Sequence, residues 1–311
     1  MYYVICSYEG ILRKWELTSD TKAKKVVSFD GVYKGSIPED FAINPVDDSI
    51  VLVYGNKETL RVVSLTGEEQ DIIVEEIAEK NHDTGVSCVA FLRCKMNNNP
   101  VFVTSDKKSH RIVAWGMVER TWTNVGSYKL HSSAITGICG LFDQPVVVSV
   151  GRDQRAIAYD IKKQSTLREA PVRADCFAVA ANPIDYRLLC IQTGDDERQL
   201  KYWDVRSKET ANAMFGWKRS KDSQKTALVK PAWSPSGLLL SCGPAEEKVR
   251  VFDIRYCSAK NPSITFSDHS GKVFKVAWAP TCSVLVTTSL NDKKIGLYSL
   301  RGDVLRGDVL R

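Results

Sequence analysis

Histidine often acts as a general base or as a metal ligand near neutral pH, and this 311-residue chain has only four. They are His82, His110, His131 and His269. All except His110 precede a short apolar run by three to five residues, as in "HSSAITGIC" and "HSGKVFKVAW". Recurrence at the same distance from similar runs indicates a structural position in a repeat rather than one active site. His110 falls in a polar turn, where we expect it to be solvated.

The other residues that carry chemistry do not form a known motif. The chain contains no GxxxxGK[ST] phosphate loop, no GxGxxG and no HExxH. Its nine cysteines include no CxxC pair, and most lie in apolar, β-like runs, which favours buried reduced thiols over disulfides or a metal site. We therefore expect no catalytic residues, no metal and no cofactor, and a protein that is not an enzyme.

The composition and the N-terminal segment give an expectation for the cellular location of the protein. The chain is 43% hydrophobic and 26% charged, which is typical of a globular protein, and its net charge is +6. No apolar run reaches the ~18 residues that a membrane span requires. The N-terminal "MYYVICSYEG" lacks the basic and apolar segments of a signal peptide. We expect an intracellular protein, in the cytoplasm, the nucleus or both, with no membrane partner.

One strand-like pattern recurs along the whole chain. In segments such as "LRKWEL" (12–17) and "LKYWDV" (200–205), apolar residues alternate with others, and a bulky residue precedes a small or acidic one. We call these bulky residues the strand anchors. They are Trp15, Val63, Trp115, Tyr159, Trp203, Phe252 and Tyr298, at successive spacings of 48, 52, 44, 44, 49 and 46 residues. Such a period is the signature of a repeat architecture.

Each repeat holds several short strands and no helical periodicity. A β-rich run such as "PVVVSV" precedes each anchor, and an earlier strand often closes at a proline turn, as in "FAINP", "VAANP" and "VAWAP". The pattern predicts about four short strands in each unit and an all-β fold.

These features together resemble the WD40-repeat family, in which each unit is one blade of a β-propeller. Trp203-Asp204 matches the family's Trp-Asp signature literally, and Tyr159-Asp160 and Phe252-Asp253 match it nearly. The resemblance implies a seven-bladed WD40-like β-propeller. The first blade lacks its inner strand in this interpretation, because Met1 leaves room for only two strands before Trp15.

The resemblance also sets the expected domain boundaries. The propeller spans residues 1–302, and residues 303–311 form a C-terminal tail that can supply the outer strand of the last blade. The approximate blades are 1–35, 36–84, 85–130, 131–174, 175–220, 221–268 and 269–302.

In this family the histidine packs with a hydroxyl residue, a turn aspartate and the strand anchor of one blade. The resemblance implies two such structural sets, namely His131, Ser149, Asp153 and Tyr159, and His269, Thr288, Asp292 and Tyr298. A histidine, a serine and an aspartate could also form a hydrolytic triad. Two copies at the same phase of the repeat favour the structural role.

Basic residues gather in loops that share one face of a WD40-like propeller. We call them the basic rim: Lys107, Lys108, Arg152, Arg155, Lys218, Arg219, Lys221, Lys293 and Lys294. Such a rim suits an acidic or phosphorylated protein segment, or a nucleic-acid backbone. The alternative is that these turns are simply polar and solvated.

Two strand ends extend the signature to Trp/Phe-Asp-x-Arg, in "YWDVR" and "VFDIR". They resemble the motif by which certain WD40 proteins dock the propeller adaptor of cullin–RING ubiquitin ligases. The residues concerned are Trp203, Asp204, Arg206, Phe252, Asp253 and Arg255. The alternative is that both arginines are ordinary solvated side chains.

The sequence thus favours a non-catalytic scaffold or adaptor of a multiprotein complex. Two alternatives stay open, a substrate receptor of a cullin–RING ubiquitin ligase and an RNA-associated assembly factor.

Overall fold

The structure is a computed structural model, and it describes most of the 311 residues. The described ranges are 2–6, 12–19, 22–29, 38–44, 50–54, 59–63, 74–78, 86–92, 99–106, 108–119, 121–142, 144–210, 214–219, 229–243, 246–256, 262–279, 284–289, 292, 294–301 and 304–310. The chain divides into two compact units. Unit 1 comprises Met1–Leu17, Ala23–Asp153 and Ile157–Leu167, and unit 2 comprises Thr18–Lys22, Gln154–Ala156 and Arg168–Arg311.

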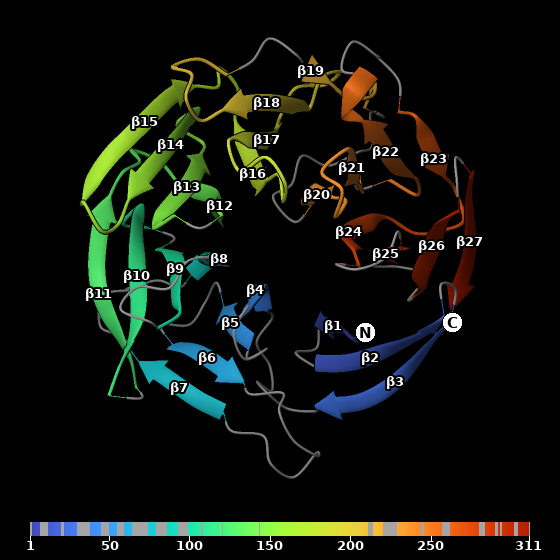
Figure 1. Cartoon of the computed structure of the whole chain (residues 1–311), viewed down its shortest axis with the longest axis horizontal. Coiled ribbons are helices and arrows are strands. Elements are labelled where there is room, and N and C mark those ends of the chain that lie inside the picture. The colour runs from blue at the N-terminus through green and yellow to red at the C-terminus, as the bar shows by residue number, and fades with distance from the viewer. Residues whose placement is uncertain are drawn as a thin grey trace. The chain divides into compact units, whose positions relative to one another are not determined.

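Three antiparallel sheets come from the first 129 residues, almost entirely from unit 1 (Figure 1). The first, in the order β1-β2-β3, comprises β1 (Tyr2–Cys6), β2 (Leu12–Ser19) and β3 (Lys22–Phe29). The second, β4-β5-β6-β7, comprises β4 (Pro38–Ile43), β5 (Ile50–Tyr54), β6 (Thr59–Val63) and β7 (Val74–Ala78). The third, β8-β9-β10-β11, comprises β8 (Val86–Phe91), β9 (Val101–Asp106), β10 (Arg111–Val118) and β11 (Thr121–Lys129).

The fourth sheet spans the part of the sequence where the two units divide. Its order is β12-β13-β14-β15, with β12 (Ile135–Gly140), β13 (Val146–Gly151), β14 (Arg155–Asp160) and β15 (Ser165–Pro171).

Unit 2 carries three further four-stranded sheets, drawn from yellow to red in Figure 1. One comprises β16 (Cys176–Ala181), β17 (Leu188–Thr193), β18 (Leu200–Asp204) and β19 (Met214–Phe215). The next comprises β20 (Ala232–Trp233), β21 (Leu239–Cys242), β22 (Val249–Asp253) and β23 (Ile264–Phe266), with a 3₁₀ turn at Ile254–Tyr256 after β22. The last comprises β24 (Val273–Trp278), β25 (Val284–Ser289), β26 (Ile295–Arg301) and β27 (Val304–Leu310).

Six of the seven strand anchors are buried, and Trp15 is half-buried. Trp115 is 1% exposed and packs with Phe102 and Trp122 in unit 1. In unit 2, Trp203 and Tyr298 are fully buried, and Phe252 packs among the apolar residues of β17 to β22. Burial of large aromatic side chains dominates the energetics of such small sheets. The alternation in the sequence therefore predicted the buried face correctly.

A β-bulge recurs near the start of the first strand in five of the sheets, within the residues that the structure describes. The strand register shifts by one residue at Pro38/Asp40, Val86/Cys88, Ile135/Gly137, Cys176/Ala178 and Val273/Lys275. A bulge bends its strand and increases the local twist.

The expected all-β fold with four-stranded units is confirmed. The first sheet has three strands among the described residues, against four in each of the others. The tail expected to extend the last unit forms β27, which pairs with β26 from Ile295↔Leu310 to Arg301↔Val304. The number of blades and the single-domain boundaries stay predictions.

Candidate functional site

His131 is the centre of a buried polar network in unit 1. Its Nδ1 lies 2.9 Å from both carboxylate oxygens of Asp153, and its Nε2 lies 2.8 Å from Oγ of Ser149. A carboxylate only accepts hydrogen bonds, so Nδ1 donates to Asp153. The Ser132 N–H donates to the same carboxylate at 3.1 Å. The network ties the loop before β12 to the β13 strand and to the turn that follows it.

This network has the residue types of a hydrolytic triad but not the access that one needs. The hydroxyl-bearing residue Ser149 and the imidazole of His131 are both 0% exposed. A nucleophile must reach the reacting atom of a substrate, and Ser149 cannot. The fourth expected member, Tyr159, packs its ring against Tyr128, with 4.8 Å between ring centroids.

His269 repeats the arrangement in unit 2. Its Nδ1 lies 3.0 Å from Oδ2 of Asp292, and the Ser270 N–H donates to that oxygen at 3.1 Å. Burial tends to raise the pKa of the Asp292 carboxyl, but hydrogen bonds from the Lys294 N–H and from His269 outweigh it, so the pKa lies below its ordinary value. The ring of Tyr298 approaches the same place from β26.

The expected hydroxyl partner of His269 was wrong by one residue. Nε2 of His269 lies 2.8 Å from Oγ1 of Thr287, not of Thr288. The turn from Thr287 to Asp292 is one residue longer than the turn from Ser149 to Asp153, so counting back from the strand anchor reached the neighbour. Gly296 makes room for the network, because a Cβ there would lie 3.0 Å from Nε2 of His269.

Two sheets of unit 2 use a basic residue of the third strand in their networks, buried in one case and half-buried in the other, which the sequence did not lead us to expect. Lys201 is 6% exposed, donates from Nζ to the Val172 carbonyl at 3.1 Å, and pairs with Oδ2 of Asp195 at 3.0 Å. Arg250 pairs with Oε2 of Glu246 at 2.8 Å. Each basic residue lies three positions before the aspartate that ends its strand. A basic residue inside an apolar strand, with an acid in the preceding turn, was the available signal.

The arginines of the two Trp/Phe-Asp-x-Arg segments fold back onto their own aspartates. Nε of Arg206 donates to Oδ1 of Asp204 at 3.0 Å, and Nε of Arg255 donates to Oδ1 of Asp253 at 2.9 Å. The hydrogen bond and charge of Arg206 hold the pKa of Asp204 at about 2. Each side chain stays more than half exposed, at 64% for Arg206 and 59% for Arg255. A carboxylate of another protein must therefore compete with an internal one, while Trp203 and Phe252 are core residues.

The basic rim is partly described. Lys107, Lys221 and Lys293 lie outside the described residues. Of the others, Lys108 and Arg152 are exposed in turns, Lys218 is exposed in the segment after β19, and Lys294 is half-buried.

Two rim arginines are engaged within the protein. Arg155 forms an ion pair with Glu169, Nη2 to Oε2 at 2.6 Å. Arg219 is half-buried and its Nη2 donates to the Asp195 carbonyl at 3.4 Å, and burial lowers its pKa. The turn between β17 and β18, whose carbonyls accept hydrogen bonds from Arg219, carries the exposed acids Asp196 and Glu197. In unit 2 the basic rim is therefore a surface of mixed charge. The definition of the rim by lysine and arginine alone did not include the neighbouring acids.

Comparison with known proteins supports the structural interpretation of the histidine sets. Residues 260–299 match the family model described as WD domain, G-beta repeat, and this segment contains His269, Thr287, Asp292 and Tyr298. The WD40 resemblance is confirmed. With the sheets described above, the chain has an all-β fold of the WD40-like β-propeller class.

Relatives match most of the chain at low identity. The protein named "Protein transport protein sec13" from Aspergillus fumigatus is 22% identical over 267 residues, which cover 78% of this chain and 85% of the relative. Its namesake from Aspergillus clavatus is 21% identical over 272 residues, covering 78% and 88%. The Aspergillus oryzae protein of the same name is 22% identical over 266 residues, again covering 78% and 88%. In the described part of this chain, no helix has the length and apolar character to cross a membrane.

Proposed function

We propose that this WD40 protein is a non-catalytic scaffold that binds other proteins within a multiprotein complex. The main support for the proposal is the location of the polar and charged side chains. The histidine and hydroxyl side chains that could work together are buried, as His131 and Ser149 are, while exposed basic side chains such as those of Lys108 and Arg152 lie on turns. Turns on a rigid scaffold vary without disturbing the core and are common binding surfaces.

The relatives support the same class of function. All three are named as protein transport proteins and match over 78% of this chain. We therefore place the scaffold in protein transport and expect it inside the cell. Sequence identity of 21–22% leaves the partners to be found by experiment.

The rim gives the proposal a specific contact. Lys108 and Arg152 are exposed in turns of unit 1, where an acidic or phosphorylated segment of a partner could pair with them. Affinity capture of the tagged full chain, with partners identified by mass spectrometry, is the test. We expect Lys108→Glu with Arg152→Glu to remove partners that wild type retains.

The matched control is Lys162→Glu. Lys162 is exposed and follows the end of β14, whereas Arg152 lies in the turn before β14. Loss of the same partners from this control, or retention of all partners by the double variant, would contradict rim binding. A partner list dominated by a cullin–RING adaptor would favour the ligase receptor instead. RNA released by added salt would favour the assembly factor.

A further inference from the structure

Ile184 is the most exposed large apolar side chain among the described residues, at 68%. It lies in the turn between β16 and β17, with Tyr186 (37% exposed) two residues later. Leu238, in the corresponding turn between β20 and β21, is 39% exposed. Single exposed apolar residues are common, but three on neighbouring turns indicate a contact surface.

The two turns are joined by a buried side chain. Asn182 is 3% exposed, and its Oδ1 accepts the N–H groups of Ile184 and Asp185 at 2.9 and 3.0 Å. Its Nδ2 donates to the Gly237 carbonyl at 2.8 Å. Gly237 has a φ of +69°, and a Cβ there would lie 2.5 Å from Oδ1 of Asn182, so the turn requires glycine. Ile184 and Leu238 are thus presented on a fixed backbone.

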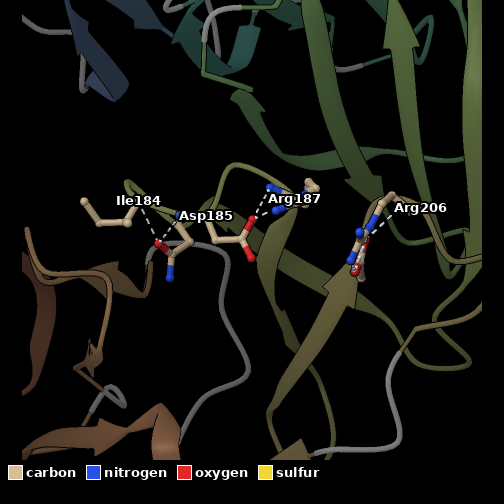
Figure 2. A network of polar contacts seen from close by, with 6 residues as sticks. Ile184, Asp185, Arg187 and Arg206 are labelled. Atoms are coloured by element: carbon tan, nitrogen blue, oxygen red, sulfur yellow. Dashed lines mark hydrogen bonds and ion pairs between the residues drawn. The ribbon is translucent and has the colours of Figure 1, made fainter.

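One ion pair follows Ile184 in the same turn, and a second lies at the end of β18. In the view of Figure 2, the Asp185–Arg187 pair lies between Ile184 and Arg206. Nε of Arg187 donates to Oδ1 of Asp185 at 3.2 Å, and Arg206 pairs with Asp204. The Arg187 guanidinium also lies 5.5 Å from the centroid of the Tyr186 ring. The four charged side chains are 39–64% exposed. Two carboxylates and two guanidiniums give these pairs no net charge.

This composition selects among partners. A surface that binds a nucleic acid or a phosphopeptide needs an excess of positive charge. The two Asp–Arg ion pairs are neutral overall and do not supply it. A two-fold interface uses the same patch on both copies, so the patch must complement itself. An apolar centre with equal numbers of acids and arginines satisfies that condition, because each pair can meet an oppositely oriented pair.

We propose that the self-contact surface, formed by Ile184, Tyr186 and Leu238 with the Asp185–Arg187 and Asp204–Arg206 pairs, binds a second copy of this chain across a two-fold axis. This goes beyond the proposed scaffold function, which concerns other proteins and the rim.

Sedimentation velocity of the purified full chain at increasing concentration is the first test. We expect a monomer–dimer equilibrium with a dissociation constant in the range of about 1–100 µM, as for a small interface. Ile184→Asp should raise the dissociation constant at least tenfold. Leu167→Asp, which changes a 41% exposed apolar residue on β15, should leave it unchanged. Circular dichroism and urea midpoints check that both variants fold.

A charge-reversal experiment tests directly whether the surface is complementary to itself. One variant carries Asp185→Arg and Asp204→Arg, and the other carries Arg187→Asp and Arg206→Asp. Each should fail to self-associate, whereas an equimolar mixture should form the heterodimer.

A wild-type chain that stays monomeric at about 200 µM would overturn the proposal, even if another protein were later found on this surface. A dimer that neither Ile184→Asp nor the charge variants affect would place the contact elsewhere and would also overturn it. Either result leaves the affinity-capture test of the scaffold function unchanged.

Discussion

The ammonium group of Lys201 lies 3.0 Å from a carboxylate oxygen of Asp195, although Lys201 is 6% exposed. A lysine is almost never this buried unless it is paired. In this sheet the pair joins the third strand to the turn before it, and the Lys201 ammonium also binds the Val172 carbonyl at 3.1 Å. His131 and His269 make comparable links in other sheets. A polar side-chain link between a strand and a turn of its sheet is thus made by a lysine–aspartate pair in one sheet and by a histidine–aspartate pair in others.

Replacing Lys201 tests this link. Lys201→Met keeps the apolar stem but removes the donor to the Val172 carbonyl, so we expect a loss of about 1–3 kcal/mol in the free energy of unfolding. Asp195 is 41% exposed and regains water, which limits the loss. Urea unfolding measures the effect, and Lys208→Met at an exposed position is the control. Equal midpoints for the two variants would show that the buried pair adds no stability.

Thr287 and Thr288 offer a matched pair for the His269 network. Thr287→Val removes the hydroxyl partner of a buried imidazole nitrogen with little change of shape, and it should cost about 1–3 kcal/mol. Thr288→Val should lie within about 0.5 kcal/mol of wild type. Thermal and urea unfolding of both variants give the comparison. A greater loss from Thr288→Val would contradict the observed contact.

Asp204 should titrate unusually low. Its hydrogen bonds to Arg206 hold its pKa at about 2, against an ordinary 3.8. Since the folded pKa is depressed, the pair adds stability above the ordinary value, and this contribution is lost as pH falls from about 4 through 2. NMR titration of the carboxyl carbon should show the pKa rise towards 3.8 in Arg206→Ala. The Arg255→Ala variant should shift Asp253 and leave Asp204 unchanged, and a shared shift would contradict local pairing.

The buried thiols of unit 2 should resist alkylation. Burial raises the pKa of Cys242 to about 12, with Arg250 and Arg219 opposing the rise, and burial also raises that of Cys190. The thiolate is the reactive form, and neither residue is exposed. At pH 8, mass spectrometry should find both unmodified by iodoacetamide in the native protein and both modified in guanidinium chloride. Rapid native modification would show that these sheets open readily.

Local patterns predicted the fold because alternation and aromatic spacing act within one strand. Trp115, Trp203 and Tyr298 were recognised as strand anchors from their neighbours alone, and all three are at most 1% exposed. The buried faces therefore followed from hydrophobic burial with no knowledge of the three-dimensional contacts.

Side-chain networks depend on register and turn length, which local patterns do not give. One added residue between Thr287 and Asp292 moved the histidine contact by a position. Arg155 was assigned to a binding rim, but cross-strand pairing brings it to Glu169, fourteen residues away. Asn182 joins turns 55 residues apart, and nothing in its own segment indicates this.

The bulge near the start of the first strand has a consequence for the origin of the chain. The five residues that it leaves out of register are Glu39, Ser87, Thr136, Phe177 and Phe274, and no side-chain chemistry is common to all five. Such backbone irregularities persist within families. A feature that recurs at one position without a common residue points to inheritance from a single ancestral unit, copied in tandem before the copies diverged. Comparing strand registers should therefore reveal kinship between units whose Trp-Asp signature has been lost.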